Sequence, residues 1–147
     1  MKQLIGFIIL CCTLFGCKKQ QPEIYVKTVI IYRDTCDSEF IRKIGHLETG
    51  NTDSLFYAGG KGRYGIYDVC VTGSGLRDLL GYRHEDMHDS TRSAHVFWAM
   101  MGIFCHQYAQ KHGKYPTYED LARMWAGGPN AYERESTLFY LSKFRKL

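Results

Sequence analysis

Residues 89–112 carry the pattern of one long amphipathic helix, and a helix of that length organises a chain of only 147 residues around itself. Asp89 is suited to the N-cap position and Gly113 to the C-terminal stop. The apolar positions recur at helical spacing and form a stripe of Ala94, Phe97, Trp98, Met101, Phe104, Cys105 and Tyr108. The pattern predicts a central, buried helix against which the other elements pack.

Two further helices are indicated on the C-terminal side of this one. Thr117 and Asp120 have the spacing of a capping box and open a helix that extends to about Trp125. The turn Gly127-Gly128-Pro129 breaks that helix. A last helix is expected from about Ser136 to Lys146, with cations in its final turn, where the helix dipole favours positive charge.

The part of the domain before the long helix is less regular. From Ser38 to about Gly50 the pattern is helical, with apolar residues at positions 40, 41, 44 and 47. Residues 50–65 are rich in glycine, asparagine and aspartate, which is typical of a loop or small hairpin. A short helix is expected around Leu76–Leu80. The fold class predicted from these patterns is α+β, predominantly α, with a small β or loop-rich region.

Composition agrees with one globular domain, which we place at residues 38–147. Apolar residues make up 45% of the chain and charged residues 23%, which is unlike a disordered protein. The net charge of +4 is too small for a nucleic-acid binder built on a dense basic patch, so no nucleic-acid partner is expected. A mildly basic protein does suit an anionic polymer or surface.

The N-terminus has the character of an export signal. Residues 4–15 are uncharged, and this run is of signal-peptide length and too short to span a bilayer. It is followed by Gly16-Cys17, and the junction resembles a bacterial lipobox. The resemblance implies cleavage before Cys17 and lipid on its sulfur, so residues 1–16 would be a lipoprotein signal peptide and 17–37 a lipidated tether or extended segment. The alternatives are a plain secretory signal and an uncleaved anchor.

Export has consequences for location and for the cysteines. The residue after Cys17 is Lys18 and not the aspartate familiar as an inner-membrane retention signal, so we expect an outer-membrane anchor facing the periplasm. An oxidising compartment also permits one disulfide among Cys36, Cys70 and Cys105. The sequence does not fix which two of them pair.

Glu48 is the acid with the most unusual position. It lies four residues after Ile44 and eight after Phe40, so it falls on the apolar stripe of its predicted helix. It also lies at the C-terminal end of that helix, where the dipole disfavours negative charge. Partial burial and the dipole both raise a carboxyl pKa, which is the property that a general acid near neutral pH requires. The alternative is a glutamate at the edge of the stripe with its carboxylate in solvent.

Four segments, in order, resemble the lysozyme-like superfamily, in the branch that holds invertebrate-type lysozymes and soluble lytic transglycosylase-like domains. The first three are similar to the end of the catalytic helix, to a tyrosine-containing turn and to the start of the central helix. The fourth is similar to the Gly-Gly-Pro segment with the aromatic helix that follows, and it is the most specific. The segments are IGHLETGN (44–51), GRYGIYDV (62–69), DMHDSTRSAHVFWAMM (86–101) and DLARMWAGGPNAYERESTLFYLSKFRKL (120–147).

The resemblance implies a lysozyme-like fold in which a lobe at 50–72 forms one wall of a sugar cleft. It implies that Glu48 is the general acid on the glycosidic bond between N-acetylmuramic acid and N-acetylglucosamine in peptidoglycan. Tyr67 would line the cleft, and the segment Ala126-Gly127-Gly128-Pro129 would form the other wall. The expected partners are peptidoglycan strands and, through the lipid, a membrane. No cofactor or metal is expected, and the oligomeric state is left open.

Several residues depart from the family pattern. Asp68 stands where the family has glutamine, Ala126 replaces an asparagine, and Gly59-Gly60-Lys61 takes the place of a loop that carries a second acid in invertebrate-type enzymes. Three hypotheses follow. Glu48 could act alone, as in a lytic transglycosylase; Asp68 could supply the second carboxylate of a muramidase; or the protein could be a catalytically degenerate glycan-binding or inhibitor lipoprotein.

One motif indicates a different chemistry. His84-Glu85-Asp86-Met87-His88 matches the H-E-x-x-H pattern of zinc proteases, which requires both histidines on one face of a stable helix. No apolar stripe surrounds the motif, and Asp89 caps the helix that follows. We therefore expect a polar turn here and keep the zinc protease as a remote alternative.

Overall fold

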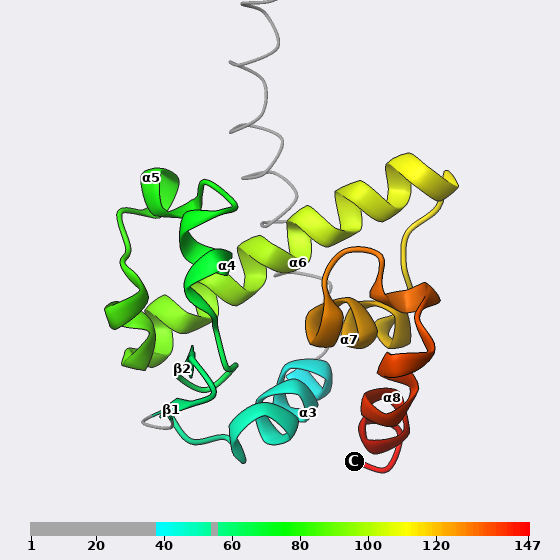
Figure 1. Cartoon of the computed structure of the whole chain (residues 1–147), viewed down its shortest axis with the longest axis horizontal. Coiled ribbons are helices and arrows are strands. Elements are labelled where there is room, and N and C mark those ends of the chain that lie inside the picture. Colours follow the sequence, from blue (N-terminus) through cyan, green and yellow to red (C-terminus); the bar gives the residue numbers. More distant parts are fainter. Residues whose placement is uncertain (1–37, 54–55) are drawn as a thin grey trace, which may run out of the picture.

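Helix α6 (Ser90–His112) crosses the molecule and carries other elements on both of its halves (Figure 1). The computed structural model describes residues 38–53 and 56–147, so the predictions for the signal peptide, Cys17 and the tether lie outside the described residues. The Asp89 side chain accepts a hydrogen bond from the backbone N–H of Arg92, and Gly113 is left-handed with φ 65°. Both predicted ends of the long helix are confirmed.

The burial of α6 goes beyond the predicted stripe. Val96, Ala99, Met100 and Ile103 are buried as well, whereas Trp98 is only half-buried. The middle of α6 is therefore enclosed on several sides, because elements pack around it and not against one face.

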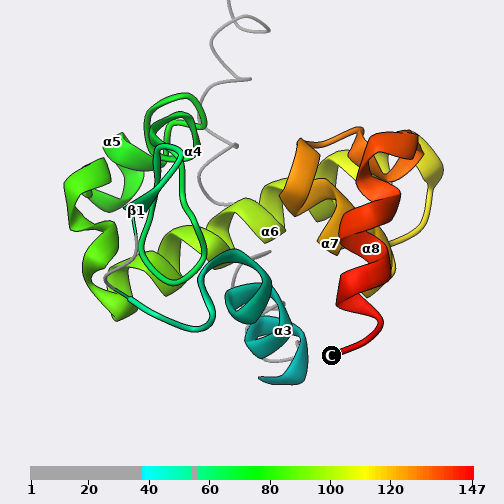
Figure 2. The ribbon, with the colours of Figure 1, turned by 60° about the horizontal axis from the view of Figure 1, so that its bottom comes forward.

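The small lobe, residues 56–88, packs on the first half of α6 (Figures 1 and 2). It begins with a hairpin of β1 (Phe56–Tyr57) and β2 (Gly60–Lys61), in which Phe56 pairs with Lys61 and Tyr57 with Gly60. Three short helices follow: α4 (Asp68–Thr72), α5 (Leu76–Leu80) and the 3₁₀ turn η1 (His84–His88). The hairpin and α5 confirm predictions, whereas α4 was not predicted.

The helical lobe, residues 118–144, packs on the second half of α6. It contains α7 (Tyr118–Gly127), the 3₁₀ turns η2 (Ala131–Glu133) and η3 (Glu135–Thr137), and α8 (Leu138–Phe144). The predicted capping box is present, since Thr117 accepts from the Asp120 backbone and Asp120 accepts from the Thr117 backbone. The single helix expected from Ser136 is wrong in detail, because the chain begins there as η3 and becomes α-helical at Leu138.

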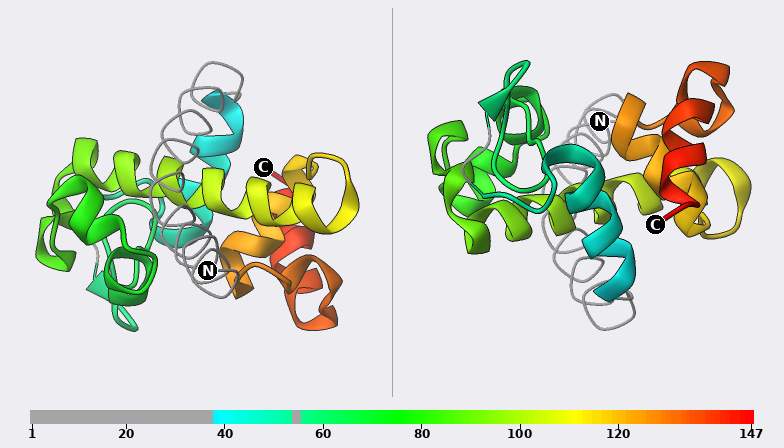
Figure 3. Two further views of the ribbon diagram at one scale, coloured as in Figure 1. Left: turned by 90° about the horizontal axis from the view of Figure 1, so that it is seen from above. Right: turned by 90° about the horizontal axis from the view of Figure 1, so that it is seen from below.

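Helix α3 (Ser38–Thr49) crosses α6 between the two lobes (Figure 3). Phe40 and Ile44 are buried as their spacing predicts, and the Phe40 ring stacks on Tyr118 and meets Phe144 edge-on. One core of buried residues extends from Phe40 to Phe144 and joins α3 to both lobes.

The predicted class, predominantly α with little strand, is confirmed in the residues that the structure describes. In these same residues, no helix is both long enough and apolar enough to cross a membrane.

Candidate functional site

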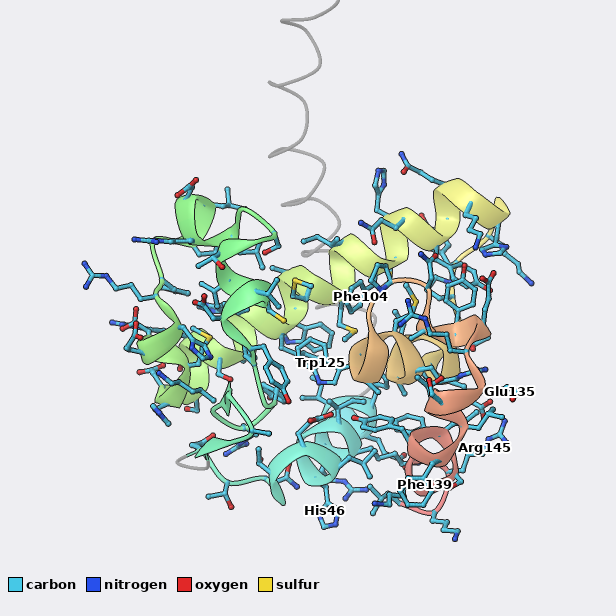
Figure 4. All side chains as sticks on the ribbon, in the orientation of Figure 1. His46, Phe104, Trp125, Glu135, Phe139 and Arg145 are labelled. Carbon is cyan, nitrogen blue, oxygen red and sulfur yellow. The ribbon has the colours of Figure 1, made fainter. Side chains whose placement is uncertain are left out.

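A cleft of about 710 Å³ lies between the two lobes. Its floor is α6, which contributes Met100, Ile103 and Phe104. One wall comes from the small lobe and the other from the end of α7 and from α8. Figure 4 shows Phe104 and Trp125 where α6 and α7 face each other in the middle of the molecule. The cleft therefore has a largely apolar base, to which Gln107 of α6 adds one polar side chain.

Glu48 enters this cleft from the last turn of α3. Its side chain is half-buried, and Oε1 accepts a hydrogen bond of 2.7 Å from the Tyr140 hydroxyl. Burial raises the pKa of the Glu48 carboxyl above its ordinary value of 4.5, while the hydrogen bond from Tyr140 lowers it and so opposes the rise. The upward direction expected from the sequence is confirmed, and its largest cause is desolvation.

The second oxygen of Glu48 faces Gly65. A Cβ added to Gly65 would lie 3.0 Å from Oε2, and Gly65 has φ 61°, a conformation that favours glycine. None of the described residues forms a hydrogen bond with Oε2, and Oε2 is not fully buried. Oε2 is therefore the oxygen of this carboxyl that is open to the cleft.

Tyr140 comes from α8, 92 residues from Glu48 in sequence. Burial, and then the neighbouring Glu48, raise the pKa of the Tyr140 hydroxyl above its ordinary value. The hydroxyl therefore keeps its proton and acts as a donor, whichever charge state Glu48 adopts.

Hydrogen bonds fix the surroundings of Glu48 from both sides. The neighbouring Thr49 donates to the carbonyl of Arg63 at 2.6 Å, and the Arg63 guanidinium makes two hydrogen bonds of 2.9 Å to Asp53. From the other lobe, the Trp125 indole N–H donates to the carbonyl of Tyr64 at 3.2 Å. These contacts hold the turn that contains Gly65 against the end of α3.

The structure brings most of the predicted site residues together. Tyr67, Ala126, Gly127, Gly128 and Pro129 all line the cleft with Glu48. Tyr67 is 46% exposed and belongs to the small-lobe wall, and the other four form the helical-lobe wall.

Asp68 is the exception. It is exposed at the start of α4 and does not line the cleft that contains Glu48. Its backbone carbonyl accepts from the Thr72 hydroxyl at 2.9 Å, a bond local to α4. Among the described residues that line the cleft, Glu48 is the one acidic side chain.

The two glycines of the helical-lobe wall are required for different reasons. A Cβ on Gly127 would lie 2.8 Å from the Cβ of Ala131, so Gly127 permits close packing of α7 on η2. Gly128 has φ 89° and nothing within 4 Å of an added Cβ, so it permits the turn itself.

The H-E-x-x-H motif forms η1, the polar turn that was predicted. His84 Nε2 lies 2.7 Å from the carbonyl oxygen of Ile66, and His88 Nδ1 lies 3.4 Å from that of Asp53. The two imidazoles thus contact two different segments of the chain, one before and one after the β1–β2 hairpin. No group of three or more potential metal ligands occurs in residues 38–53 and 56–147.

The cysteines of the described chain occupy different settings. Cys70 lines the cleft, and burial raises the pKa of its thiol. Cys105 is buried within α6, and no disulfide joins it to Cys70. Cys36 lies outside the described residues, so a pairing that involves it stays a prediction.

Three residues that shape the site were not predicted from the sequence: Gly65, Trp125 and Tyr140. Gly65 lies inside one of the quoted segments, between Tyr64 and Ile66, and its being a glycine was the available signal. No sequence signal pairs Tyr140 with Glu48 or Trp125 with Tyr64.

Comparisons of the chain with protein-family models, with curated proteins and with solved structures find no match. The lysozyme-like resemblance is therefore taken forward as a proposal that rests on residues and geometry.

Proposed function

We propose that this protein is a lysozyme-like glycosidase that cuts the glycan strand of peptidoglycan, with Glu48 as general acid. The observation that carries the proposal is the environment of one carboxyl group. Glu48 lies in an interlobe cleft with a raised pKa, one oxygen bonded to Tyr140 and the other open to the cleft. A raised pKa favours the protonated form of the carboxyl, and a protonated carboxyl that can reach a ligand is suited to protonating a leaving oxygen.

The proton would reside on Oε2. Oε1 already accepts the Tyr140 hydrogen, so the carboxylic acid places its own hydrogen on the oxygen beside Gly65. From there it would pass to the glycosidic oxygen as the bond between that oxygen and the sugar carbon breaks. The two walls and the apolar floor would position the sugar rings across Glu48.

A route with a single carboxylate is better supported than a muramidase with two. Asp68 is exposed and outside the cleft, whereas two-carboxylate hydrolysis needs both groups on the same bond. In the single-carboxylate route, the Glu48 carboxylate left after proton transfer takes a proton from a hydroxyl of the substrate itself. That hydroxyl oxygen then bonds to the sugar carbon and closes an anhydro ring, so no water is consumed.

The anchor belongs to the same proposal. Lipid on Cys17 would hold the domain at the outer membrane, facing the cell wall in the periplasm. Cys17→Ala should then abolish lipidation and leave the signal peptide attached. A lipidated mature form of that variant would refute the lipobox.

The decisive experiment compares wild type with Glu48→Gln on purified sacculi, using protein without its lipid. Glutamine keeps the shape and can still accept from Tyr140, but it has no proton to give. We expect release of muropeptides to fall about 10²–10⁴-fold, the usual contribution of a general acid, with equal binding to sacculi.

Asp68→Asn separates the two routes. Near-full activity with anhydro products supports the single-carboxylate route, while collapse with reducing-end products supports a two-carboxylate hydrolase. If wild type is as inert as Glu48→Gln on several peptidoglycans and over a broad pH range, the enzyme proposal fails. Ala126 and the other departures from the family pattern would then belong to a glycan-binding or inhibitor lipoprotein.

A further inference from the structure

The cleft does not end at Tyr140. A second hollow of about 310 Å³ shares Ala126, Gly127 and Tyr140 with the cleft, so the two adjoin. Its remaining wall includes Phe139 and Lys143 from α8. A strand bound across Glu48 can therefore continue past Tyr140 into the hollow beside α8.

Lys143 is the one charged side chain among the described residues that line this second hollow. Its Nζ lies 4.4 Å from the centroid of the Phe139 ring, and no carboxylate of the described residues pairs with it. The two arginines that contact lining residues of this hollow are engaged within the protein, since Arg123 donates to the Thr137 hydroxyl and Arg134 to the Gly127 carbonyl. Two other cations pair with carboxylates. Lys111 pairs with Glu133 at 2.9 Å, and Arg145 is paired with Glu119.

Phe139 adds a second unusual feature, because its ring is 69% exposed at the edge of the hollow. A single exposed ring is common on protein surfaces, but this one borders a hollow that adjoins the cleft, where it can contact a bound ligand. Lys143 interacts favourably with the dipole at the end of α8 whether or not Phe139 lies beside it, so the dipole does not account for the exposed ring. The pair thus presents a flat apolar face and an ammonium group, which matches a sugar ring that carries a carboxylate.

We infer that the hollow formed by Phe139 and Lys143 is a subsite that recognises a carboxylate on the bound glycan strand. The inference rests on the proposed function and restricts its substrate class to acidic glycans, as opposed to neutral ones of the same backbone. Peptidoglycan offers such a group from two sources: the lactyl ether of a sugar without a peptide, and the stem peptide attached to it.

The test measures binding, so that catalysis does not interfere. Glu48→Gln serves as the background, and the probes are peptide-bearing glycan strands, strands stripped of peptide by an amidase, and chitin oligomers, which carry no carboxylate. Lys143→Gln should lower affinity for at least one acidic probe by about 10-fold or more, because a hydrogen bond to a charged group is lost. Affinity for chitin oligomers should stay unchanged, and Lys143→Arg should retain most of the affinity.

The two acidic probes identify the source of the carboxylate. A loss confined to stripped strands points to the lactyl group, and a loss confined to peptide-bearing strands points to the stem peptide. Lys146→Gln is the matched control, because it removes the same charge from an exposed residue that does not line the hollow.

Three results would overturn the inference: no loss with Lys143→Gln, an equal loss on chitin oligomers, or an equal loss with Lys146→Gln. Each is distinct from failure of the proposed function, which would appear as wild-type protein that releases no product from sacculi. Both substituted lysines are exposed, so the variants should fold as the parent does, and their circular dichroism and thermal midpoints check this.

Discussion

The two lobes act on the same carboxyl group by opposite means. The helical lobe supplies a side chain, since Tyr140 on α8 donates to Oε1 of Glu48. The small lobe contributes a residue without a side chain, since Gly65 leaves space beside Oε2. One oxygen is thereby held and the other left accessible, which gives the carboxyl a defined direction without enclosing it. The comparison teaches that a glycine can contribute to a site as specifically as a hydrogen-bond donor.

The lobes also differ in how they are built. The helical lobe relies on capped helices, with the capping box at Thr117 and the bonds of Arg123 to Thr137 and to the Arg134 carbonyl. The small lobe relies on turns with positive φ, at Gly59, Gly62, Gly65, Gly75 and Gly81. Substitutions at these small-lobe glycines are therefore expected to act through the backbone, and those at the capping and arginine contacts of the helical lobe through side chains.

Among variants that alter only one of the two lobes, the largest effect is expected from Gly65→Ala. The new Cβ would lie 3.0 Å from Oε2 of Glu48, and the alanine would have to keep the left-handed φ of 61°. Left-handed backbone costs a residue with a Cβ about 1–2 kcal/mol, and a displaced catalytic group can cost about 10²-fold in rate. Urea unfolding and muropeptide release measure the two losses.

Gly81→Ala is the control for that variant. Gly81 has φ 69° in the same lobe, but nothing lies within 4 Å of its added Cβ. It should lose a similar amount of stability and keep its activity. Equal loss of activity in both variants would contradict a specific contact between Gly65 and Glu48.

A smaller effect is expected from Tyr140→Phe. In wild type, the hydrogen bond from Tyr140 lowers the pKa of Glu48. Phenylalanine cannot donate this bond, so the pKa of Glu48 should rise further in the variant. Because the protonated form is the active one, the alkaline limb of the pH–activity profile should move to higher pH. The rate at the optimum should fall about 10-fold, since the carboxyl is no longer held.

The matched substitution in the small lobe is Tyr82→Phe, which removes a hydroxyl 3.0 Å from His95 Nδ1 and outside the cleft. Its profile should coincide with that of wild type. An alkaline limb that stays in place in Tyr140→Phe would count against Glu48 as the titrating acid.

The smallest effect concerns stability. The folded state raises the pKa of Glu48 above its ordinary value of 4.5, so it binds the proton more tightly than the unfolded state does. The free energy of unfolding of wild type should therefore fall as pH rises from 4.5 to the higher pKa of the folded state, and Glu48→Gln should not show that fall. The variant should unfold at a higher temperature than wild type at neutral pH, and the difference should vanish below about pH 4. Thermal midpoints across pH provide the measurement, with Asp68→Asn as an exposed control.

Local signals in the sequence predicted much of the fold. The caps at Asp89, Gly113 and Thr117 depend on neighbouring residues alone, and the structure contains all three. The stripe of α3 predicted the burial of Ile44 and, with it, the position of Glu48 at a buried edge. Helix α4 was missed because glycines surround its five residues and hide any periodicity.

The site was less predictable because its contacts are long-range. Spacing along one helix cannot show that Tyr140 meets Glu48, or that the Trp125 indole reaches the Tyr64 carbonyl 61 residues away. The same reason applies to Asp68, which stands where the family turn has glutamine and was a candidate for the second carboxylate. The start of α4 instead turns Asp68 outward while Tyr67 stays in the cleft wall.

The indole of Trp125 can also serve as an intrinsic fluorescence probe of the cleft. Its N–H is bonded to the small lobe while its backbone belongs to α7, so its surroundings depend on the separation of the lobes. The chain has one other tryptophan, Trp98, which lies on α6, and its ring meets Phe97 edge-on. The emission of Trp125 should therefore respond when a ligand opens or closes the cleft, with no added dye.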